Sequence, residues 1–112
     1  MNESFPRLLV IAWLVVLNVT SPVAGQDDPA LVAQGRRIYA ERGCDGCHAV
    51  DATGRRSGPD LSTVGRRYSA SYLTYWLSAN PYRGAVHMPK VALTDAELKA
   101  LVAYLGTLRL PY

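Results

Sequence analysis

The stretch Cys44-Asp45-Gly46-Cys47-His48 holds both cysteines of this 112-residue chain and one of its two histidines. The spacing C-x-x-C-H is the signature of covalent attachment of a c-type haem. Two thiols three positions apart can each form a thioether to one of the two haem vinyl groups, and the histidine that follows supplies an axial nitrogen to the iron. The motif therefore predicts one covalent haem, with His48 as an iron ligand.

Other interpretations of the motif are weaker. A disulfide between Cys44 and Cys47 would close a very small loop and would stabilise the fold little. A thioredoxin-like redox pair requires a βαβ pattern, which the chain lacks. A zinc site of two cysteines and two histidines needs separated ligand pairs, whereas His48 follows Cys47 directly.

Residues 1–25 have the order of a secretory signal peptide. Arg7 precedes an almost wholly apolar run from Leu8 to Val19, and small residues follow at Val23-Ala24-Gly25. The run is shorter than the roughly 20 residues that span a bilayer. We therefore expect cleavage, a mature domain of residues 26–112 without a membrane span, and a periplasmic location. The alternative is an uncleaved leader that anchors the domain to the inner membrane.

The charge of the chain is modestly basic, with a formal net value of +3 and several paired arginines. Such an excess can steer association with an acidic partner. Nucleic-acid binding is not expected, because the sequence has no dense basic stripe interleaved with aromatic residues.

Three helices are predicted from apolar periodicity and end signals. The first runs from Pro29 to about Arg42, with Asp28 as its N-cap, and delivers the chain into the haem motif. The second runs from Ser69 or Ser71 to Ala79. The third follows a capping box at Thr94-Asp95-Ala96-Glu97 and ends near Gly106. Residues 49–67 are rich in turn formers and are predicted to be a long loop that wraps the haem edge.

Aromatic residues recur every four positions at Tyr68, Tyr72 and Trp76. One interpretation is an aromatic face of the core. The other is a face that covers the haem, with Trp76 or Tyr68 donating a hydrogen bond to a propionate. The sequence leaves both open, because one ring can serve both purposes.

A proline lies in a position to orient His48. An axial histidine needs an acceptor for its second ring N–H, which fixes its orientation. The stretch Gly58-Pro59-Asp60-Leu61 starts ten residues after His48. The Pro59 carbonyl is a candidate acceptor and Leu61 a candidate contact for the haem plane, although an ordinary turn has the same composition.

Met88 is the candidate for the second axial ligand. The chain has two methionines, and Met1 leaves with the leader, so a thioether ligand must be Met88. Pro89 restricts the backbone of Met88 to extended conformations, which helps to point the side chain. His87 is the competing ligand, and an open sixth position is the remaining alternative.

Taken together, these features resemble the class I c-type cytochromes over about residues 28–106. The resemblance rests on the haem motif after a first helix, Gly58 to Leu61, Met88-Pro89 and a capped last helix, in that order. It implies an all-α cytochrome c fold, with three main helices and long loops around one covalent haem.

The resemblance also implies particular contacts. The first and last helices should cross at Gly35, Tyr39 and Tyr104. Pro59 should accept a hydrogen bond from His48. The candidates near the haem propionates are Arg67, Tyr68 and Trp76.

The expected function follows from a His48 and Met88 ligand pair. Six-coordinate iron with these ligands transfers one electron and has no free position for a substrate, so we expect an electron carrier and not an enzyme. The resemblance to class I cytochromes further implies that redox partners dock at the exposed haem edge near Cys47. Basic residues such as Arg55, Arg56 and Lys90 would steer them.

Two alternatives remain at this stage. One is a dedicated haem subunit of a periplasmic oxidoreductase, for example a molybdenum or flavin dehydrogenase. The other is a five-coordinate haem that binds a gas.

Overall fold

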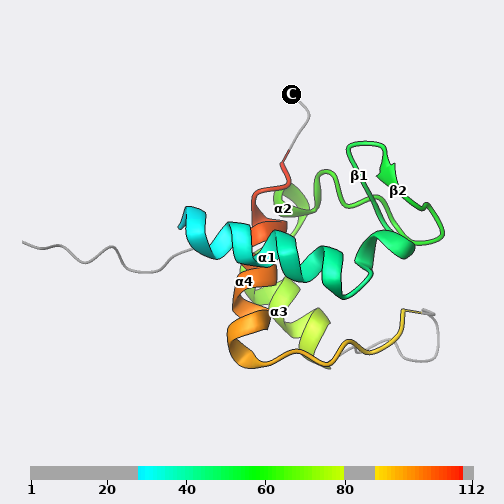
Figure 1. Cartoon of the computed structure of the whole chain (residues 1–112). Helices are drawn as coiled ribbons and strands as arrows, with labels where there is room; N and C mark the ends of the chain where they lie inside the picture. The colour runs from blue at the N-terminus through cyan, green and yellow to red at the C-terminus, as the bar shows by residue number, and fades with distance from the viewer. Residues whose placement is uncertain (1–27, 80–87, 110–112) are drawn as a thin grey trace, which may run out of the picture.

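The computed structural model describes residues 28–79 and 88–109. The predicted signal peptide and His87 lie outside these ranges. Figure 1 shows a mostly helical domain with one short hairpin. The elements in chain order are α1 (Pro29–Glu41), the 3-10 turn η1 (Cys44–Gly46), β1 (Ala49–Val50), β2 (Thr53–Gly54), α2 (Val64–Arg67), α3 (Ala70–Ala79) and α4 (Asp95–Gly106).

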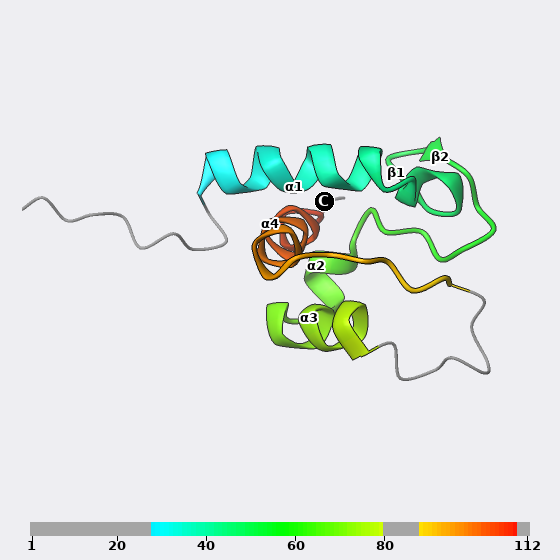
Figure 2. The same cartoon turned by 60° about the horizontal axis from the view of Figure 1, so that its bottom comes forward.

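The crossing of α1 and α4 forms the centre of the fold (Figure 2). A Cβ atom on Gly35 would lie 2.6 Å from the carbonyl carbon of Ala100 and 2.7 Å from Cβ of Tyr104. The rings of Tyr39 and Tyr104 meet edge to face, with centroids 5.5 Å apart. The predicted crossing at Gly35, Tyr39 and Tyr104 is therefore confirmed, and only glycine permits so close an approach of the two backbones.

Both helices of the crossing begin as predicted. The Asp28 side chain accepts a hydrogen bond from the backbone N–H of Ala30, and Pro29 occupies the first helical turn. At the start of α4, Thr94 and Glu97 form a reciprocal capping box. These caps satisfy backbone N–H groups that have no partner within the helix. They fix where each helix begins, and hence the register of the crossing.

Of the two interpretations of the aromatic residues, the structure does not support a core face at Tyr68 and Tyr72. Tyr68 and Tyr72 are 43% and 41% exposed and stack on each other, with ring centroids 4.6 Å apart. The core contact comes instead from Leu73, which is 5% exposed. Tyr68 precedes the helix with extended backbone, so its four-residue spacing from Tyr72 is not helical. Trp76 is partly buried.

The segment 49–67 is more regular than predicted. Val50 pairs with Thr53 across a two-residue turn, in which Asp51 and Ala52 both have positive φ, 49° and 65°. Hairpin turns of this kind usually carry Asn-Gly or Asp-Gly, and the Asp-Ala pair carries no such signal. The helix α2 then packs closely against the end of α4, where a Cβ on Gly65 would lie 2.7 Å from the Leu105 carbonyl oxygen.

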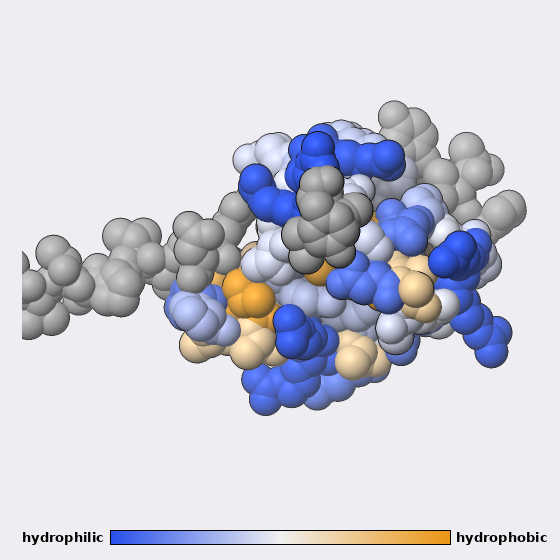
Figure 3. All heavy atoms as spheres, turned by 90° about the horizontal axis from the view of Figure 1, so that it is seen from above, coloured by the Kyte–Doolittle hydropathy of each residue, from blue (hydrophilic) through white to orange (hydrophobic). Residues whose placement is uncertain are grey.

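The surface seen from above carries hydrophilic side chains over much of its area, with a small apolar patch beside the start of α1 (Figure 3). Within residues 28–79 and 88–109, no helix has both the length and the apolar character that a bilayer crossing requires.

Candidate functional site

The haem motif begins directly after α1, where the chain reverses. Gly43 adopts a left-handed conformation with φ of 71° and ends the helix. The following 3-10 turn brings the backbone N–H groups of Cys47 and His48 to the Cys44 carbonyl, at 3.2 and 3.0 Å. Cys44 packs partly buried against the core cluster, whereas Cys47 is exposed. The turn therefore presents two free thiols and one imidazole within five residues.

The environment of Cys44 differs from that of a redox-active thiol. Burial raises the pKa of the Cys44 thiol. Cysteines of C-x-x-C redox motifs have lowered pKa values, because the thiolate is the reactive form. The Cys44 thiol therefore lacks the lowered pKa that is typical of a C-x-x-C redox pair.

The ring of His48 is oriented by Pro59. Its Nδ1 lies 2.8 Å from the Pro59 carbonyl oxygen, so the hydrogen bond expected from the sequence is present. A carbonyl oxygen only accepts, which assigns the donated proton to Nδ1. The lone pair of Nε2 is then available to a metal, and the bond to Pro59 fixes the orientation of the ring.

Two glycines hold the backbone and ring of His48 closely. A Cβ on Gly58 would lie 2.8 Å from Cε1 and 2.9 Å from Nδ1 of the His48 ring. The Gly58 N–H donates to the Cys47 carbonyl at 2.6 Å. A side chain on Gly54 would collide with the His48 carbonyl oxygen. Gly58 therefore lets the loop approach the imidazole and Gly54 lets it approach the His48 backbone, roles that turn-forming composition alone did not reveal.

Leu61 holds the same loop against the start of the hairpin. Its N–H donates to the Ala49 carbonyl at 2.9 Å, and its side chain packs partly buried against the core cluster. The 58–61 stretch therefore runs alongside the haem motif and β1, as the spacing suggested. Contact of Leu61 with a haem plane stays a prediction.

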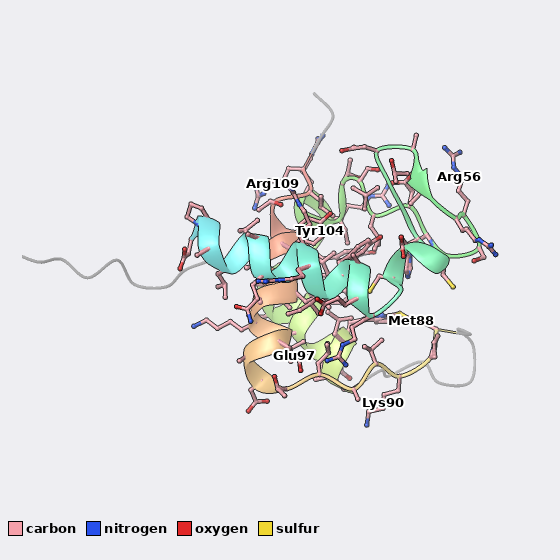
Figure 4. All side chains as sticks on the ribbon, viewed as in Figure 1. Arg56, Met88, Lys90, Glu97, Tyr104 and Arg109 are labelled. Atoms are coloured by element: carbon pink, nitrogen blue, oxygen red, sulfur yellow. The ribbon has the colours of Figure 1, made fainter. Side chains whose placement is uncertain are left out.

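Met88 and Trp76 come together although twelve residues separate them. Both line a shallow, mainly apolar hollow between the end of α3 and the segment before α4. The other lining residues are Leu77, Pro89, Lys90 and Val91. Figure 4 shows Met88 on the segment that leads to α4, and Figures 1 and 2 place this segment at the same end of the molecule as η1. The two candidate ligands therefore belong to segments at one end of the fold.

The residues predicted to lie near the haem propionates do not all come together. Arg67 closes the short helix α2 and is exposed, and Tyr68 stacks on Tyr72. Neither of them lines the hollow beside Met88, whereas Trp76 does. Their roles toward haem propionates stay predictions.

Arg42 makes contacts that no pattern in the sequence indicates. It is the C-cap of α1, and its guanidinium donates to the Ala92 carbonyl and forms an ion pair with Glu97. The hydrogen bonds from Thr94 lower the pKa of Glu97, and Arg42 lowers it further. The end of α1 is therefore fastened to the segment between Met88 and α4.

The donor set of these residues fits a covalent c-type haem. Cys44 and Cys47 would form the thioethers, His48 Nε2 would ligate the iron, and Met88 offers a thioether as a second ligand. Within the two described stretches, no three His, Cys, Asp or Glu side chains converge as a site for a bare metal ion.

Comparison with known protein families gives a match over most of the chain. The family described as Cytochrome c matches residues 32–109. This range includes the motif at Cys44 to His48, the 58–61 stretch and Met88.

Three curated proteins are similar to the chain. Cytochrome c oxidase subunit 2 of Alkalihalophilus pseudofirmus is 33% identical over 89 residues, which cover 70% of this chain and 26% of that protein. CcoP of the Cbb3-type cytochrome c oxidase of Helicobacter pylori is 28% identical, covering 88% of this chain and 35% of that one. One subunit of the nitric oxide reductase of Paracoccus denitrificans is 29% identical, covering 66% and 56%. The chain thus spans between a quarter and just over half of these relatives, and no solved structure gave a significant match.

Proposed function

The chain belongs to the cytochrome c family, and we therefore propose that it is a one-electron carrier with its haem iron held between His48 and Met88. A c-type haem with this ligand pair supplies a reversible ferric–ferrous couple at raised potential and no open position for a substrate. The proposed role is therefore transfer of electrons between proteins, with no catalytic residue of its own.

The observation that carries this proposal is the hydrogen bond between His48 Nδ1 and the Pro59 carbonyl. It assigns the tautomer, so that the iron-binding nitrogen is Nε2. The Gly58 backbone lies so close to the ring that only glycine fits there. A fixed ring lowers the reorganisation that accompanies a change of charge on the iron, which is the main task of the protein in electron transfer.

Met88 is proposed as the second ligand because of its surroundings. The neighbouring side chains of Trp76, Leu77 and Val91 are apolar, which suits a neutral thioether. Pro89 restricts the Met88 backbone to extended conformations. A soft, neutral sulfur in such a site favours the reduced iron and raises the potential.

The test of this ligand pair is the Met88→Ala variant of the haem-loaded protein. A methionine bond to ferric iron gives a weak charge-transfer absorption near the red end of the spectrum. We expect this band in the unmodified protein, its loss in Met88→Ala, and its retention in Val91→Ala, which alters the same hollow. An unchanged spectrum in Met88→Ala would contradict the assignment and leave His87 as the candidate.

The proposed docking surface surrounds Cys47. Its side chain is exposed, so the thioether edge of the haem would lie near solvent. Arg56 and Lys90 project away from the body of the molecule (Figure 4), and Arg55 is exposed beside Arg56. These charges favour an acidic redox partner.

The proposed location is the periplasm, after cleavage of the leader near residue 25. It is supported by the leader sequence and by the need of c-type haem motifs for attachment outside the cytoplasm. Intact mass of the purified holoprotein tests this point. A mass that includes residues 1–25 would favour the membrane-anchored alternative.

A second candidate function is a haem domain held permanently on a respiratory oxidase or reductase. The observation that favours it is that the three similar proteins are subunits of such enzymes. Gentle purification distinguishes the candidates. A carrier should elute as a free monomer, whereas a subunit should elute with its complex and lose electron transfer when it is separated.

A further inference from the structure

The contacts of Arg42 join the two halves of the proposed ligand site. Arg42 lies two residues before Cys44, at the end of α1. Its guanidinium donates to the carbonyl of Ala92, four residues after Met88, and pairs with Glu97 in the first turn of α4. One side chain thus connects the element that carries the haem motif to the segment that carries Met88.

We propose that Arg42 is a positioning residue for Met88, which it keeps within reach of the iron that His48 ligates. The inference rests on the proposed function, because it requires Met88 to be the second ligand. Arg42 acts through the backbone of the 88–94 segment and does not touch the iron or the thioether.

The segment after Met88 depends on contacts from outside because it has no regular secondary structure. Residues 88–94 lie in coil. Leu93 packs partly buried against the core cluster, which holds the end of the segment that is far from Met88. The Arg42 contact to Ala92 lies one residue nearer to Met88. It adds a link to α1 beside the contacts that Met88 and Val91 make in the hollow, so it restrains the segment when the thioether leaves the iron.

Both ends of this connection are firmly held. Arg42 is the C-cap of α1, and its own N–H donates to carbonyls of the preceding turn. Glu97 is fixed by the capping box, in which its carboxylate accepts from the Thr94 N–H at 3.0 Å and its own N–H donates to the Thr94 hydroxyl at 3.1 Å. The side chains of Arg42 and Glu97 are only 33% and 24% exposed, which reduces screening of the pair by solvent.

Arginine suits this position better than lysine. Its planar fork carries several N–H donors in fixed directions, so two nitrogens can serve a carbonyl and a carboxylate at the same time. Here one terminal nitrogen serves Ala92 and the other serves Glu97. A lysine ammonium retains the charge but is a single point, so it would hold the two partners less rigidly.

The experiment measures how fast Met88 leaves the ferric iron of the haem-loaded protein. Exogenous imidazole replaces the thioether only after the iron–sulfur bond opens, and loss of the methionine charge-transfer band follows the replacement. We expect Arg42→Ala to accelerate the replacement about fivefold, the factor that loss of one partly exposed, charge-assisted contact gives. Arg42→Lys should give a smaller acceleration.

Two control variants separate positioning from other effects. Arg37→Ala removes an exposed arginine from the same helix, so it changes the net charge equally and should leave the rate unchanged. Ile38→Val removes a methyl group from a buried position on α1, so it lowers global stability without touching the Met88 segment. Denaturant unfolding of every variant gives the global stability against which the exchange rates are compared.

The outcomes are distinct. A faster exchange in Arg42→Ala than in both controls supports the positioning role. Equal rates in Arg42→Ala and Arg37→Ala overturn it, as does an equal acceleration in an Ile38→Val protein of the same global stability. If the unmodified protein lacks the methionine band and binds imidazole without delay, the ligand assignment fails first, and this inference fails with it.

Discussion

Replacement of Gly35 by alanine tests the central crossing of the fold. A Cβ at this position would lie 2.6 Å from the carbonyl carbon of Ala100 and 2.7 Å from Cβ of Tyr104, whereas ordinary contact begins at 3.4 Å. The obstacle at Ala100 is backbone of α4, which cannot rotate away as a side chain would. The two helices must therefore separate, and the edge-to-face contact of Tyr39 with Tyr104 opens with them.

The expected change in the free energy of unfolding of Gly35→Ala is the sum of two opposing contributions. Overpacking of this kind costs roughly 1–3 kcal/mol, and a backbone obstacle puts Gly35→Ala at about 3 kcal/mol on that scale. Alanine in a helix interior is favoured over glycine by about 1 kcal/mol. The net expectation is a free energy of unfolding that is lower by about 2 kcal/mol.

The assay is guanidinium unfolding of the haem-loaded protein, followed by circular dichroism and by haem absorption. Ala33→Gly, at an exposed position of α1, is the matched control, because it measures the helix-propensity term without the crossing; it should lower the free energy of unfolding by about 1 kcal/mol. The sign of the result decides the question. If Gly35→Ala stabilises the protein by about 1 kcal/mol, helix propensity alone acts at this position, and the close crossing is refuted.

Three further predictions concern the hairpin, the capping box and the charged surface. Ala52 has a φ of 65°, so Ala52→Gly should raise the free energy of unfolding by about 0.5–1 kcal/mol in a denaturant titration, and a loss of stability would contradict the strained turn. Hydrogen bonds from Thr94 lower the pKa of Glu97. The ionised carboxylate therefore contributes fully to the free energy of unfolding above the ordinary glutamate pKa, and this contribution is lost as the pH falls through the pKa of Glu97 in the folded protein. In Glu97→Gln the free energy of unfolding should therefore fall less steeply as the pH is lowered. An unchanged pH dependence argues against this contribution. Association with the redox partner should slow as salt rises, and less steeply in Arg55→Gln/Arg56→Gln, when followed by stopped-flow absorption; equal slopes would remove the steering role of these charges.

The amino-acid pattern alone was enough to predict the chemistry of the site and the ends of the helices. The haem motif is a local pattern, because its thiols and imidazole lie within five residues of the chain and need no tertiary contact to be recognised. The caps at Asp28 and Thr94 are local for the same reason, since each bonds an N–H within three residues. The crossing at Gly35 and Tyr104 and the bond from His48 to Pro59 were reached through resemblance to a known family as well as through spacing.

The hairpin and the aromatic stripe show where local patterns failed. Asp51-Ala52 adopts a turn that its residues only tolerate, because the pairing of Val50 with Thr53 imposes it. Tyr68 and Tyr72 had helical spacing, but the backbone at Tyr68 is extended and both rings face solvent. In each case the neighbouring elements, and not the local residue types, determine the backbone conformation of the turn and the exposure of the rings.

The way in which the two halves of the site are held depends on tertiary packing. Gly58 is an ordinary turn residue in the sequence, and it is the distance from its backbone to the His48 ring that makes it a positioning element. Arg42 and Ala92 are fifty residues apart, and no propensity or periodicity links them. Contacts of this kind arise from the packing of α1 against α4, which brings the end of one helix beside the approach to the other.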